Sequence, residues 1–323
     1  MIRWGIIGSG KIAKTFAREF QFITNAEIVF VAASEQNKAR NFAAEFSIPH
    51  YGTYNDIFTA DLVDVIYIAL PHSHHYPFIV KCLEAGKHVL SEKPITVNAL
   101  QLREVIALAT QQKLFVMEAM WTLFLPAVQI AKRWCEEGRI GTIVSLSAEF
   151  AFPAPNPGPE RLYNPSLAGG SLLDIGIYPI TICRYFMDKL PQHFSLQYQK
   201  SPTGVDKAVD LLLSYENALA RLSCAFTHRA PNSAFIYGTD GYIEIPVFWK
   251  SKNCLLYSND GNITDHFDDS APYHGFFYEI DHVNACLIRN QFESKIMPLS
   301  LSLEILDFMD KVRNKMELTY PFE

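Results

Sequence analysis

The segment IRWGIIGSGKIA, residues 2–13, decides the fold of the N-terminal part of this 323-residue chain. An apolar strand pattern at residues 2–7 runs into G-x-G-x-x-[G/A] at the start of a helix. In such a turn Gly8 permits the tight bend, Gly10 lets a pyrophosphate approach the backbone, and Ala13 is small enough for helix-on-strand packing. The alternative is a tight turn that binds nothing, but the strand–turn–helix context favours a dinucleotide site. The residues expected to contact the dinucleotide are Gly8, Ser9, Gly10, Lys11 and Ile12.

Strands and helices alternate through the first third of the chain with short connections. The expected strands are residues 2–7, 26–33, 63–69, 88–90 and 115–117, and the expected helices are residues 11–22, 37–46, 75–84 and 98–111. Residues 63–69 are apolar nearly throughout, as a strand covered on both faces should be. This rhythm predicts an α/β fold with a doubly wound parallel sheet, a Rossmann domain over residues 1–120.

The pattern changes after Trp121, and residues 121–323 are expected to form a second, substrate-binding α/β domain. Its strands are longer and alternate in polarity, which predicts one open, mainly antiparallel sheet. The expected strands are residues 142–152, 195–199, 205–214, 218–227, 234–238 and 242–246, with helices at residues 126–137, 176–186, 275–290 and 300–315. Residues 153–165 read as a proline-rich surface loop.

Composition limits the classes of partner. Hydrophobic residues make up 49% of the chain and charged residues 19%, which is typical of a globular protein. No uninterrupted apolar run approaches the ~18 residues of a membrane span. A net charge of −6 without a dense Lys/Arg stripe argues against nucleic acid. We therefore expect a small-molecule partner, no membrane and no nucleic acid.

The cysteines and the N-terminus predict a cytoplasmic protein. Residues 1–5 run directly into a strand pattern and lack the layout of a secretion signal. The six cysteines are scattered, with no CxxC pair, and read as reduced, mostly buried residues. They are Cys82, Cys135, Cys183, Cys224, Cys254 and Cys286.

The end of the second strand is where the adenosine ribose is expected. NAD sites usually place an acid there, whereas NADP sites offer basic or small polar groups to the 2′-phosphate. Here Ser34 occupies the place expected for the ribose-binding acid. Glu35 remains able to bind a ribose, while Lys38 and Arg40 either bind a phosphate or form a solvated helix face. The pattern favours NADP, with NAD as the alternative.

Three histidines within residues 72–75 follow the third strand, at the edge where open α/β sheets bind ligands. They suggest a metal, but no carboxylate or Cys partner stands at a recognisable spacing, and neighbouring histidines in a turn do not easily converge on one ion. We therefore predict no metal. The alternatives are contact with the cofactor and helix capping, and the residues assigned to the cofactor here are Leu70, Pro71, His72 and His75.

The stretch A-G-K-H-V-L-S-E-K-P, residues 85–94, follows the fourth strand on the same edge as the glycine turn. With the N-terminal G-x-G-x-x-A and G-G-S-L-L-D-I-G-I-Y at residues 169–178, it makes the whole chain resemble the Gfo/Idh/MocA oxidoreductases. The resemblance implies that Lys93 lies beside the nicotinamide and the substrate hydroxyl, and that the Lys93-Pro94 bond is cis, a geometry that needs proline. Glu92 is expected to hold either the cofactor or Lys93, and Glu92, Lys93 and Pro94 are assigned to the cofactor site.

The second signature usually ends in a histidine that acts as acid/base, and Tyr178 stands at that position. Tyrosine there resembles the glucose–fructose oxidoreductase and dimeric dihydrodiol dehydrogenase branch, as does M-E-A-M-W-T at residues 117–122. Ala168 replaces the first glycine of the usual triplet, a mild change. Leu123 stands where relatives commonly carry arginine, so the resemblance leaves the substrate's polar contacts open. Leu123 and residues 153–165 are expected to control the substrate.

The residues themselves suggest an acid/base pair. Oxidation of an alcohol needs a base for the hydroxyl proton, and free tyrosine, which titrates near ~10, is a poor one at pH 7. A nearby ammonium group and a positive nicotinamide ring favour the phenolate, so Lys93 and Tyr178 are predicted to transfer the proton together. Asp174, one helical turn before Tyr178, is predicted to orient the substrate or Lys93. The alternatives are a packed tyrosine and a helix N-cap.

Aromatic residues of the second domain are candidates for a substrate wall that suits a hydrophobic or cyclic diol. They are Trp121, Phe150, Phe152, Tyr163 and Trp249, of which Trp121 and Phe152 are assigned to the substrate. The alternative is a core or an interface, because in relatives the large sheet also pairs with another subunit. We accordingly expect a homodimer or homotetramer formed through the C-terminal sheet.

Together these features predict an NAD(P)-dependent oxidoreductase. It would transfer a hydride between the nicotinamide and a secondary alcohol or carbonyl group of a sugar, polyol or cyclic trans-diol. The alternative is a sensor or regulatory protein that keeps the fold without turnover. The presence of Lys93, Asp174 and Tyr178 favours the enzyme.

Overall fold

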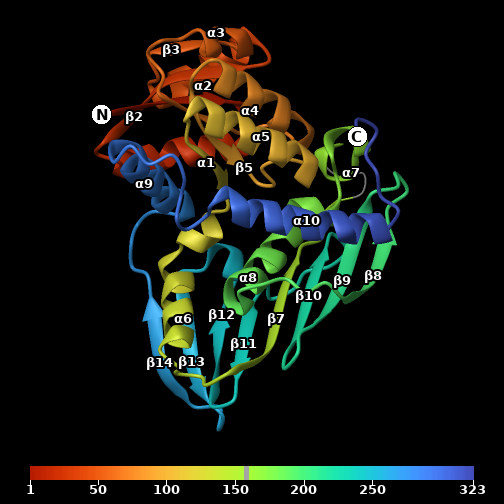
Figure 1. Cartoon of the computed structure of the whole chain (residues 1–323). Coiled ribbons are helices and arrows are strands. Elements are labelled where there is room, and N and C mark those ends of the chain that lie inside the picture. Colours follow the sequence, from red (N-terminus) through yellow and green to blue (C-terminus); the bar gives the residue numbers. More distant parts are fainter. Residues whose placement is uncertain (156–159) are drawn as a thin grey trace. The chain divides into compact units, whose positions relative to one another are not determined.

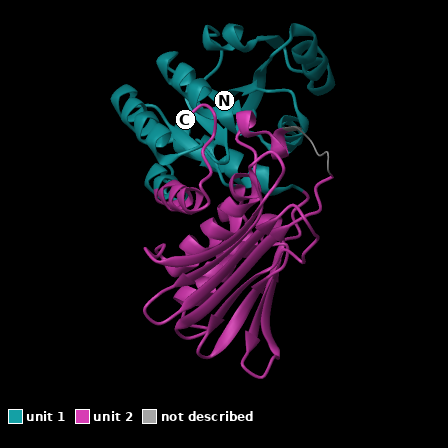
Figure 2. Cartoon of the chain, turned by 90° about the vertical axis from the view of Figure 1, so that its right-hand side faces the viewer, with its two compact units in different colours: residues 1–120, 273–303 teal, residues 121–272, 304–323 magenta. Residues whose placement is uncertain are grey.

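The computed structural model describes residues 1–155 and 160–323 and divides into two compact units, coloured separately in Figure 2. The first unit comprises residues 1–120 and 273–303, and the second comprises residues 121–272 and 304–323. The expected division after residue 120 therefore differs from the structure in one segment, residues 273–303, which belongs to the first unit.

Residues 273–303 join the first unit through buried polar contacts. The Trp4 indole N–H donates to Asn284 Oδ1 at 2.9 Å, and the His274 backbone N–H donates to the Glu19 carboxylate at 2.9 Å. Phe276 packs edge-on against Phe16 with ring centroids 5.6 Å apart. These partners lie more than 250 positions apart, so local sequence patterns do not reveal the pairing.

The first unit contains a six-stranded parallel sheet in the order β3-β2-β1-β4-β5-β6, the dinucleotide-binding order. Figure 1 labels its strands β2, β3 and β5. The expected Rossmann sheet is confirmed. Its strands are β1 Ile2–Ile7, β2 Ala26–Ala33, β3 His50–Thr53, β4 Val65–Ile68, β5 His88–Glu92 and β6 Val116–Ala119. The sequence analysis missed β3, a four-residue edge strand exposed at three of its positions, because so short a polar segment has no apolar pattern.

The helices of the first unit agree with the expected ones to within a few residues at their ends. They are α1 Lys11–Glu19, α2 Gln36–Phe46, α3 Tyr54–Phe58, α4 His75–Glu84, α5 Ala99–Gln112 and α9 Gly275–Ile288, with 3₁₀ turns at Phe20–Phe22 and His72–His74. Only α3 was not expected. It begins with a capping box, in which Thr53 and Asp56 bond to each other's backbone.

The second unit contains an eight-stranded sheet in the order β14-β13-β12-β11-β7-β10-β9-β8. α6 packs beside β12, β13 and β14, and α8 packs beside β7, β10 and β11. The strands are β7 Ile143–Ala151, β8 Phe194–Lys200, β9 Asp206–Ser214, β10 Leu219–Ala225, β11 Ala234–Gly238, β12 Gly241–Ile245, β13 Asn253–Ser258 and β14 Ile263–Asp268. The helices are α6 Pro126–Glu136, α7 Glu160–Tyr163, α8 Ile177–Met187 and α10 Leu299–Lys315, which starts within the first unit, and short turns lie at Trp121–Phe124, Pro165–Leu167, Leu172–Gly176 and Phe248–Lys250.

The sheet is mainly antiparallel as expected, with two differences. β7 and β10 run parallel, because the chain crosses over between them through α8 and the hairpin of β8 and β9. The strands β13 and β14 were not predicted. β14 is a polar edge strand exposed or half-exposed along its length, so it lacks the apolar face that marks a strand in sequence.

The segment Pro165–Met187 contains the most membrane-like helix of the described residues. Its best 18-residue window has a mean hydropathy of 1.3, and 89% of that window is buried inside the protein. This helix is apolar because it forms the core beneath the second sheet.

Candidate active site

The glycine turn after β1 has the geometry of a phosphate cradle. Gly8 has φ +113°, and a Cβ there would lie 2.3 Å from the Ala69 carbonyl oxygen, so a side chain is excluded. A Cβ at Gly10, the residue before α1, would meet nothing within 4 Å among the described residues. The backbone at Gly10 is therefore accessible to a pyrophosphate, while the backbone at Gly8 packs against the end of β4 and forms the tight turn.

The N-terminus of α1 adds to this cradle. Neither an acidic side chain nor a side-chain cap occupies its first turn among the described residues, so its N–H groups face outward. Ile12 is 39% exposed although it is apolar, while Ala13 is fully buried against the sheet. These residues fit a dinucleotide, and contact with Ser9, Lys11 and Ile12 remains a prediction.

The end of β2 presents an exposed group of polar side chains. Lys38 Nζ lies 2.5 Å from Glu35 Oε1, and both side chains are more than half exposed. Burial raises the pKa of Tyr54 above its ordinary value. A hydrogen bond between Ser34 and the Tyr54 hydroxyl offsets part of this rise. Tyr54 belongs to the unpredicted helix α3 and is therefore a residue that sequence reasoning missed at this corner.

His75 links two turns at the carboxyl edge of the sheet. It is fully buried, with Nδ1 2.7 Å from the Pro94 carbonyl oxygen and Nε2 2.9 Å from the Leu70 carbonyl oxygen. Burial lowers the pKa of His75 to about 4, so the neutral ring donates to one of these carbonyls. Both ring nitrogens of His75 thus face backbone carbonyls, which argues against the predicted direct contact of His75 with the cofactor. The neighbouring Pro71 and His72 stay predicted contacts.

Lys93 follows β5 directly, and its backbone N–H is bound by the side chain of Glu92. The Lys93-Pro94 bond is cis, as expected. Glu92 Oε1 accepts a hydrogen bond from the Tyr67 hydroxyl at 2.5 Å, and Glu92 Oε2 accepts one from the Lys93 backbone N–H at 3.3 Å. Glu92 is 9% exposed. Glu92 was expected to hold either the cofactor or Lys93, and these hydrogen bonds favour Lys93.

Two further acids surround this turn and were not predicted as site residues. Glu118, on β6, is fully buried and accepts a hydrogen bond from the Ile95 backbone N–H at 2.9 Å. Glu279, on α9, is also fully buried, and no hydrogen-bond partner reaches either of its oxygens among the described residues. Burial raises the pKa of both carboxyl groups, and the charge of Glu92 raises them further. Glu279 comes from residues 273–303, so only the structure brings it near Glu92.

In the second unit, Asp174 and Tyr178 lie on one continuous helical segment. A π-helical turn, Leu172–Gly176, carries Asp174 and leads into α8, whose second residue is Tyr178. Asp174 therefore lies inside a helical turn, and the N-cap alternative is wrong. Its Oδ1 accepts a hydrogen bond from Arg161 at 2.8 Å, with the Asp174 side chain 8% exposed and that of Arg161 51% exposed. π-helical turns are uncommon and occur often at functional sites.

The predicted aromatic wall assembles around Tyr178. Phe150 stacks on Trp249 at 4.8 Å between ring centroids and meets Tyr178 edge-on at 5.4 Å. Trp121 stacks on Trp249 with ring centroids 5.8 Å apart. Phe152 lies 6.4 Å from Phe150 and 5.3 Å from Phe226, which in turn meets Tyr163 at 5.6 Å. All five predicted aromatics thus belong to one cluster, which Phe226 completes.

Leu123 and residues 153–165 are the two features that were expected to control the substrate. Leu123 is fully buried, and its carbonyl accepts a hydrogen bond from Gln129, so its role in substrate control stays a prediction. Residues 156–159 of the proline-rich segment, among them Pro157 and Pro159, lie outside the described part of the chain. The segment also contains a short helix, α7, which carries Arg161.

Within the described ranges, no group of three or more His, Cys, Asp or Glu residues is arranged to hold a metal ion. Both ring nitrogens of His75 lie within hydrogen-bond distance of backbone carbonyl oxygens, those of Pro94 and Leu70. The His72 ring packs edge-on against the His75 ring, with ring centroids 5.8 Å apart.

Two family models match the sequence. The first, described as an oxidoreductase family with an NAD-binding Rossmann fold, matches residues 2–120. The second, the GFO/IDH/MocA C-terminal domain, matches residues 128–244.

Individual relatives match over almost the full length. The trans-1,2-dihydrobenzene-1,2-diol dehydrogenase of Mus musculus is 33% identical over 333 residues, covering 99% of this chain and 98% of the relative. The structure of KijD10, a 3-ketoreductase from Actinomadura kijaniata in complex with NADP and TDP-benzene, is 26% identical with a TM-score of 0.86, covering 97% of each chain. The aldose-aldose oxidoreductase of Caulobacter crescentus, at 22% identity and a TM-score of 0.89, covers 98% of this chain and 97% of its own and shares the fold.

Proposed function

This chain belongs to the GFO/IDH/MocA family of oxidoreductases, and we propose that it transfers a hydride between a nicotinamide cofactor and a secondary alcohol or carbonyl group of a sugar, polyol or cyclic trans-diol. The main support is the place of Lys93. It follows β5 at the sheet edge that also carries the Gly8 turn, because both turns leave the carboxyl ends of parallel strands. The contacts of Glu92 and Pro94 fix the backbone on both sides of Lys93.

In this proposal Lys93, Tyr178 and Asp174 handle the proton of the reacting hydroxyl. A bound nicotinamide supplies the hydride acceptor or donor. The Lys93 ammonium polarises the substrate oxygen and stabilises negative charge as the proton leaves. Tyr178, next to buried aromatic rings, accepts that proton as the phenolate when the alcohol is oxidised and returns it as the phenol when the carbonyl is reduced. Asp174, paired with Arg161, orients the substrate or Lys93.

The aromatic cluster supports a cyclic diol as the substrate class. Phe150 and Trp249 present flat apolar surfaces beside Tyr178, and such surfaces suit the faces of a ring. The Trp249 indole N–H is buried without a hydrogen-bond acceptor among the described residues, so a substrate hydroxyl is a suitable partner for it. The dihydrodiol dehydrogenase relatives, at about a third identity, point to the same class.

NADP is the proposed cofactor. Ser34 follows β2 at the position where an acid would select the ribose of NAD, and Lys38 and Arg40 are exposed nearby. Against this, the Lys38 charge is already paired with Glu35. An incoming 2′-phosphate would therefore compete with Glu35 for Lys38, which predicts a preference for NADP that is moderate in size.

A substrate and cofactor panel tests the proposed function. Sugars, inositols and cyclic trans-diols, each with NADP and with NAD, are followed by nicotinamide absorbance. We expect turnover of a cyclic trans-diol with a several-fold higher kcat/KM for NADP, and the Lys38→Ala/Arg40→Ala variant should lose that preference because both cations are removed. The variant Lys14→Ala, on the exposed face of α1, serves as the control for lost positive charge. An absence of turnover across the panel in both directions would contradict the function.

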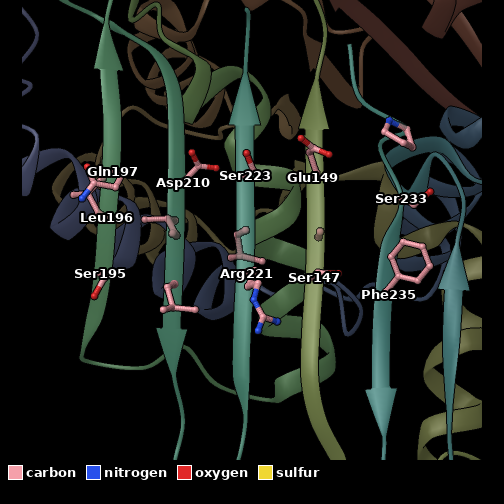
Figure 3. Close-up of a pocket in the computed structure, with 15 residues that line it drawn as sticks. Ser147, Glu149, Ser195, Leu196, Gln197, Asp210, Arg221, Ser223, Ser233 and Phe235 are labelled. Atoms are coloured by element: carbon pink, nitrogen blue, oxygen red, sulfur yellow. The ribbon is translucent and has the colours of Figure 1, made fainter. Parts of the chain in front are cut away.

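We also propose that the free face of the second sheet pairs with a second copy of the chain, giving a homodimer or homotetramer. Figure 3 shows this face, on which side chains from β7 to β11 line a shallow hollow. Leu212 is 40% exposed there, and the face continues across an aromatic ladder of Phe235, Tyr237, Tyr242 and Tyr257, with ring centroids 4.5 to 5.9 Å apart. Aromatic residues with few charges are typical of the centre of an interface. Asp210 and Arg221 on the same face offer opposite charges to a copy turned by a two-fold axis.

The variant Leu212→Asp should separate the copies. A carboxylate at the centre of an apolar interface would be buried without a partner, which weakens association. Light scattering after size exclusion should give at least twice the mass of one chain for the wild type and a single-chain mass for Leu212→Asp. Lys252→Asp, a charge change on an exposed residue beside β13, is the matched control and should leave the mass unchanged. A wild-type protein that runs as a single chain would contradict the proposal.

A cytoplasmic location is proposed from the cysteines. All six are free, and five of them are buried. Burial raises the pKa of each buried thiol, as for Cys82 and Cys224, which keeps them protonated and unreactive. Unpaired, protonated thiols fit a reducing compartment.

A further inference from the structure

Asp206, at the start of β9, is a buried acid that holds the turn before Asp174. It is 1% exposed, and its Oδ2 accepts hydrogen bonds from the Ser171 hydroxyl and from the Leu172 backbone N–H, both at 2.6 Å. Leu172 is the first residue of the π-helical turn. Asp206 therefore fixes the point at which that turn begins.

The backbone before this turn is shaped to receive Asp206. Gly170 has φ +127°, and a Cβ there would lie 2.3 Å from Asp206 Oδ1. A Cβ at Gly169 would lie 2.7 Å from the Leu162 carbonyl oxygen. The two glycines let the chain pass between β9 and α7, and the Gly170 carbonyl then accepts the hydrogen bond of the Asp174 N–H at 3.2 Å.

Tyr320 holds the same turn from another segment of the chain. Its hydroxyl donates to the Gly169 carbonyl at 2.8 Å, and its side chain is 1% exposed. The Arg313 guanidinium lies 5.2 Å from the Tyr320 ring centroid and makes two hydrogen bonds to Glu323, at 2.7 and 2.9 Å. The phenol is thus locked in one orientation.

We propose that Asp206 and Tyr320 are positioning residues, which hold residues 169–174 at two points and so place Asp174 and Tyr178 for proton transfer. This inference rests on the roles proposed for Asp174 and Tyr178. An ionisable group is a costly choice for a fully buried position, and an apolar side chain of the same size would pack there at lower cost. What an apolar side chain lacks is the acceptor that pins Ser171 and Leu172. A loose turn would misplace the acid/base groups, and displacement by about 1 Å can lower a rate 10²-fold.

Two substitutions of Asp206 separate positioning from folding. Asp206→Leu keeps the size and removes the acceptor, so kcat per cofactor-binding site should fall roughly 10²-fold while the Kd for the cofactor, bound by the other unit, stays within twofold. Asp206→Asn keeps an oxygen that can accept both hydrogen bonds, and kcat should recover to within about tenfold of the wild type. The number of cofactor-binding sites, from fluorescence titration, corrects for misfolded protein. A kcat for Asp206→Leu within twofold of the wild type would overturn the proposal.

Tyr320→Phe provides an independent test that decides the matter if Asp206→Leu fails to fold. It removes one hydroxyl, so kcat should fall roughly fivefold without a change in cofactor Kd. Tyr215→Phe is the matched control, because the Tyr215 hydroxyl also donates to a backbone carbonyl, that of Lys189 at 3.1 Å, away from the turn. Equal kcat values for Tyr320→Phe and Tyr215→Phe would overturn the role of Tyr320.

The failure of this inference is distinct from a failure of the proposed function. If Tyr178→Phe lowers kcat and the Asp206 and Tyr320 variants do not, the catalytic assignment stands and the positioning role is wrong. If Tyr178→Phe leaves kcat unchanged, the turn has no acid/base group to position, and both fail.

Discussion

The variant Lys93→Ala is expected to lower kcat by roughly 10² or more while cofactor binding is retained. The ammonium group is the only part of the residue that the proposed chemistry uses, since the backbone of the turn is held by Glu92 and by the Pro94 carbonyl. Removing the side chain beyond Cβ therefore deletes the charge that stabilises the substrate oxygen and leaves the turn intact. Steady-state kinetics with the active substrate, together with a cofactor titration, measure the two effects separately.

The matched control for Lys93 is Lys81→Ala. Lys81 is an exposed lysine on α4 in the same unit, with its ammonium 5.6 Å from the Phe78 ring centroid. It should leave kcat unchanged, which shows that loss of one positive charge from the unit has no general effect. Wild-type activity in Lys93→Ala would remove the assigned role of Lys93.

Tyr178→Phe is expected to lower kcat by roughly 10²- to 10³-fold, the range for loss of a positioned acid/base group. The ring stays in place because Phe150 and Trp249 pack against it, so only the hydroxyl is lost. The KM for the cofactor should not change, and the limb of the kcat/KM–pH profile that reports the base should disappear. Rapid-mixing kinetics across the pH range provide the measurement.

Tyr185→Phe is the control for this variant. Tyr185 lies on the same helix, α8, and is half-buried, so the change removes the same hydroxyl group at a position outside the aromatic cluster. It should behave like the wild type. If the two variants have equal activity, or if the pH profile of Tyr178→Phe keeps both limbs, Tyr178 is not the acid/base group.

The Rossmann half of the fold could be predicted in detail because its signals are local. The apolar runs of β1, β2 and β4, the glycines at 8 and 10, and the helix patterns between them each lie within a few residues. Parallel strands covered on both faces leave little ambiguity in such patterns. The short edge strand β3 escaped because a polar segment of four residues gives no periodicity.

The second half was predicted less completely, since its organisation depends on distant contacts. The parallel pairing of β7 with β10 and the edge strand β14 are set by tertiary packing. The return of residues 273–303 to the first unit depends on single hydrogen bonds such as that from Trp4 to Asn284. No local pattern encodes either feature.

The same distinction applies to the candidate site. Lys93, Asp174 and Tyr178 stand in motifs, so their type and spacing identified them. Glu118, Asp206 and Tyr320 were missed because each holds a turn that is remote in sequence. Glu279 was missed because it reaches the surroundings of Glu92 only through the return of residues 273–303 to the first unit. The burial of Leu123 was likewise not visible in its local sequence.

The most direct test of the proposed hydride transfer is an isotope experiment. The active diol, deuterated at its carbinol carbon, is incubated with the enzyme and the oxidised cofactor, and the reduced cofactor is examined by mass spectrometry. Hydride transfer predicts one deuterium in each reduced nicotinamide ring, and the Lys93→Ala variant should form the same deuterated cofactor at a rate lower by roughly 10² or more. Reduced cofactor that carries no deuterium would contradict direct hydride transfer from this substrate.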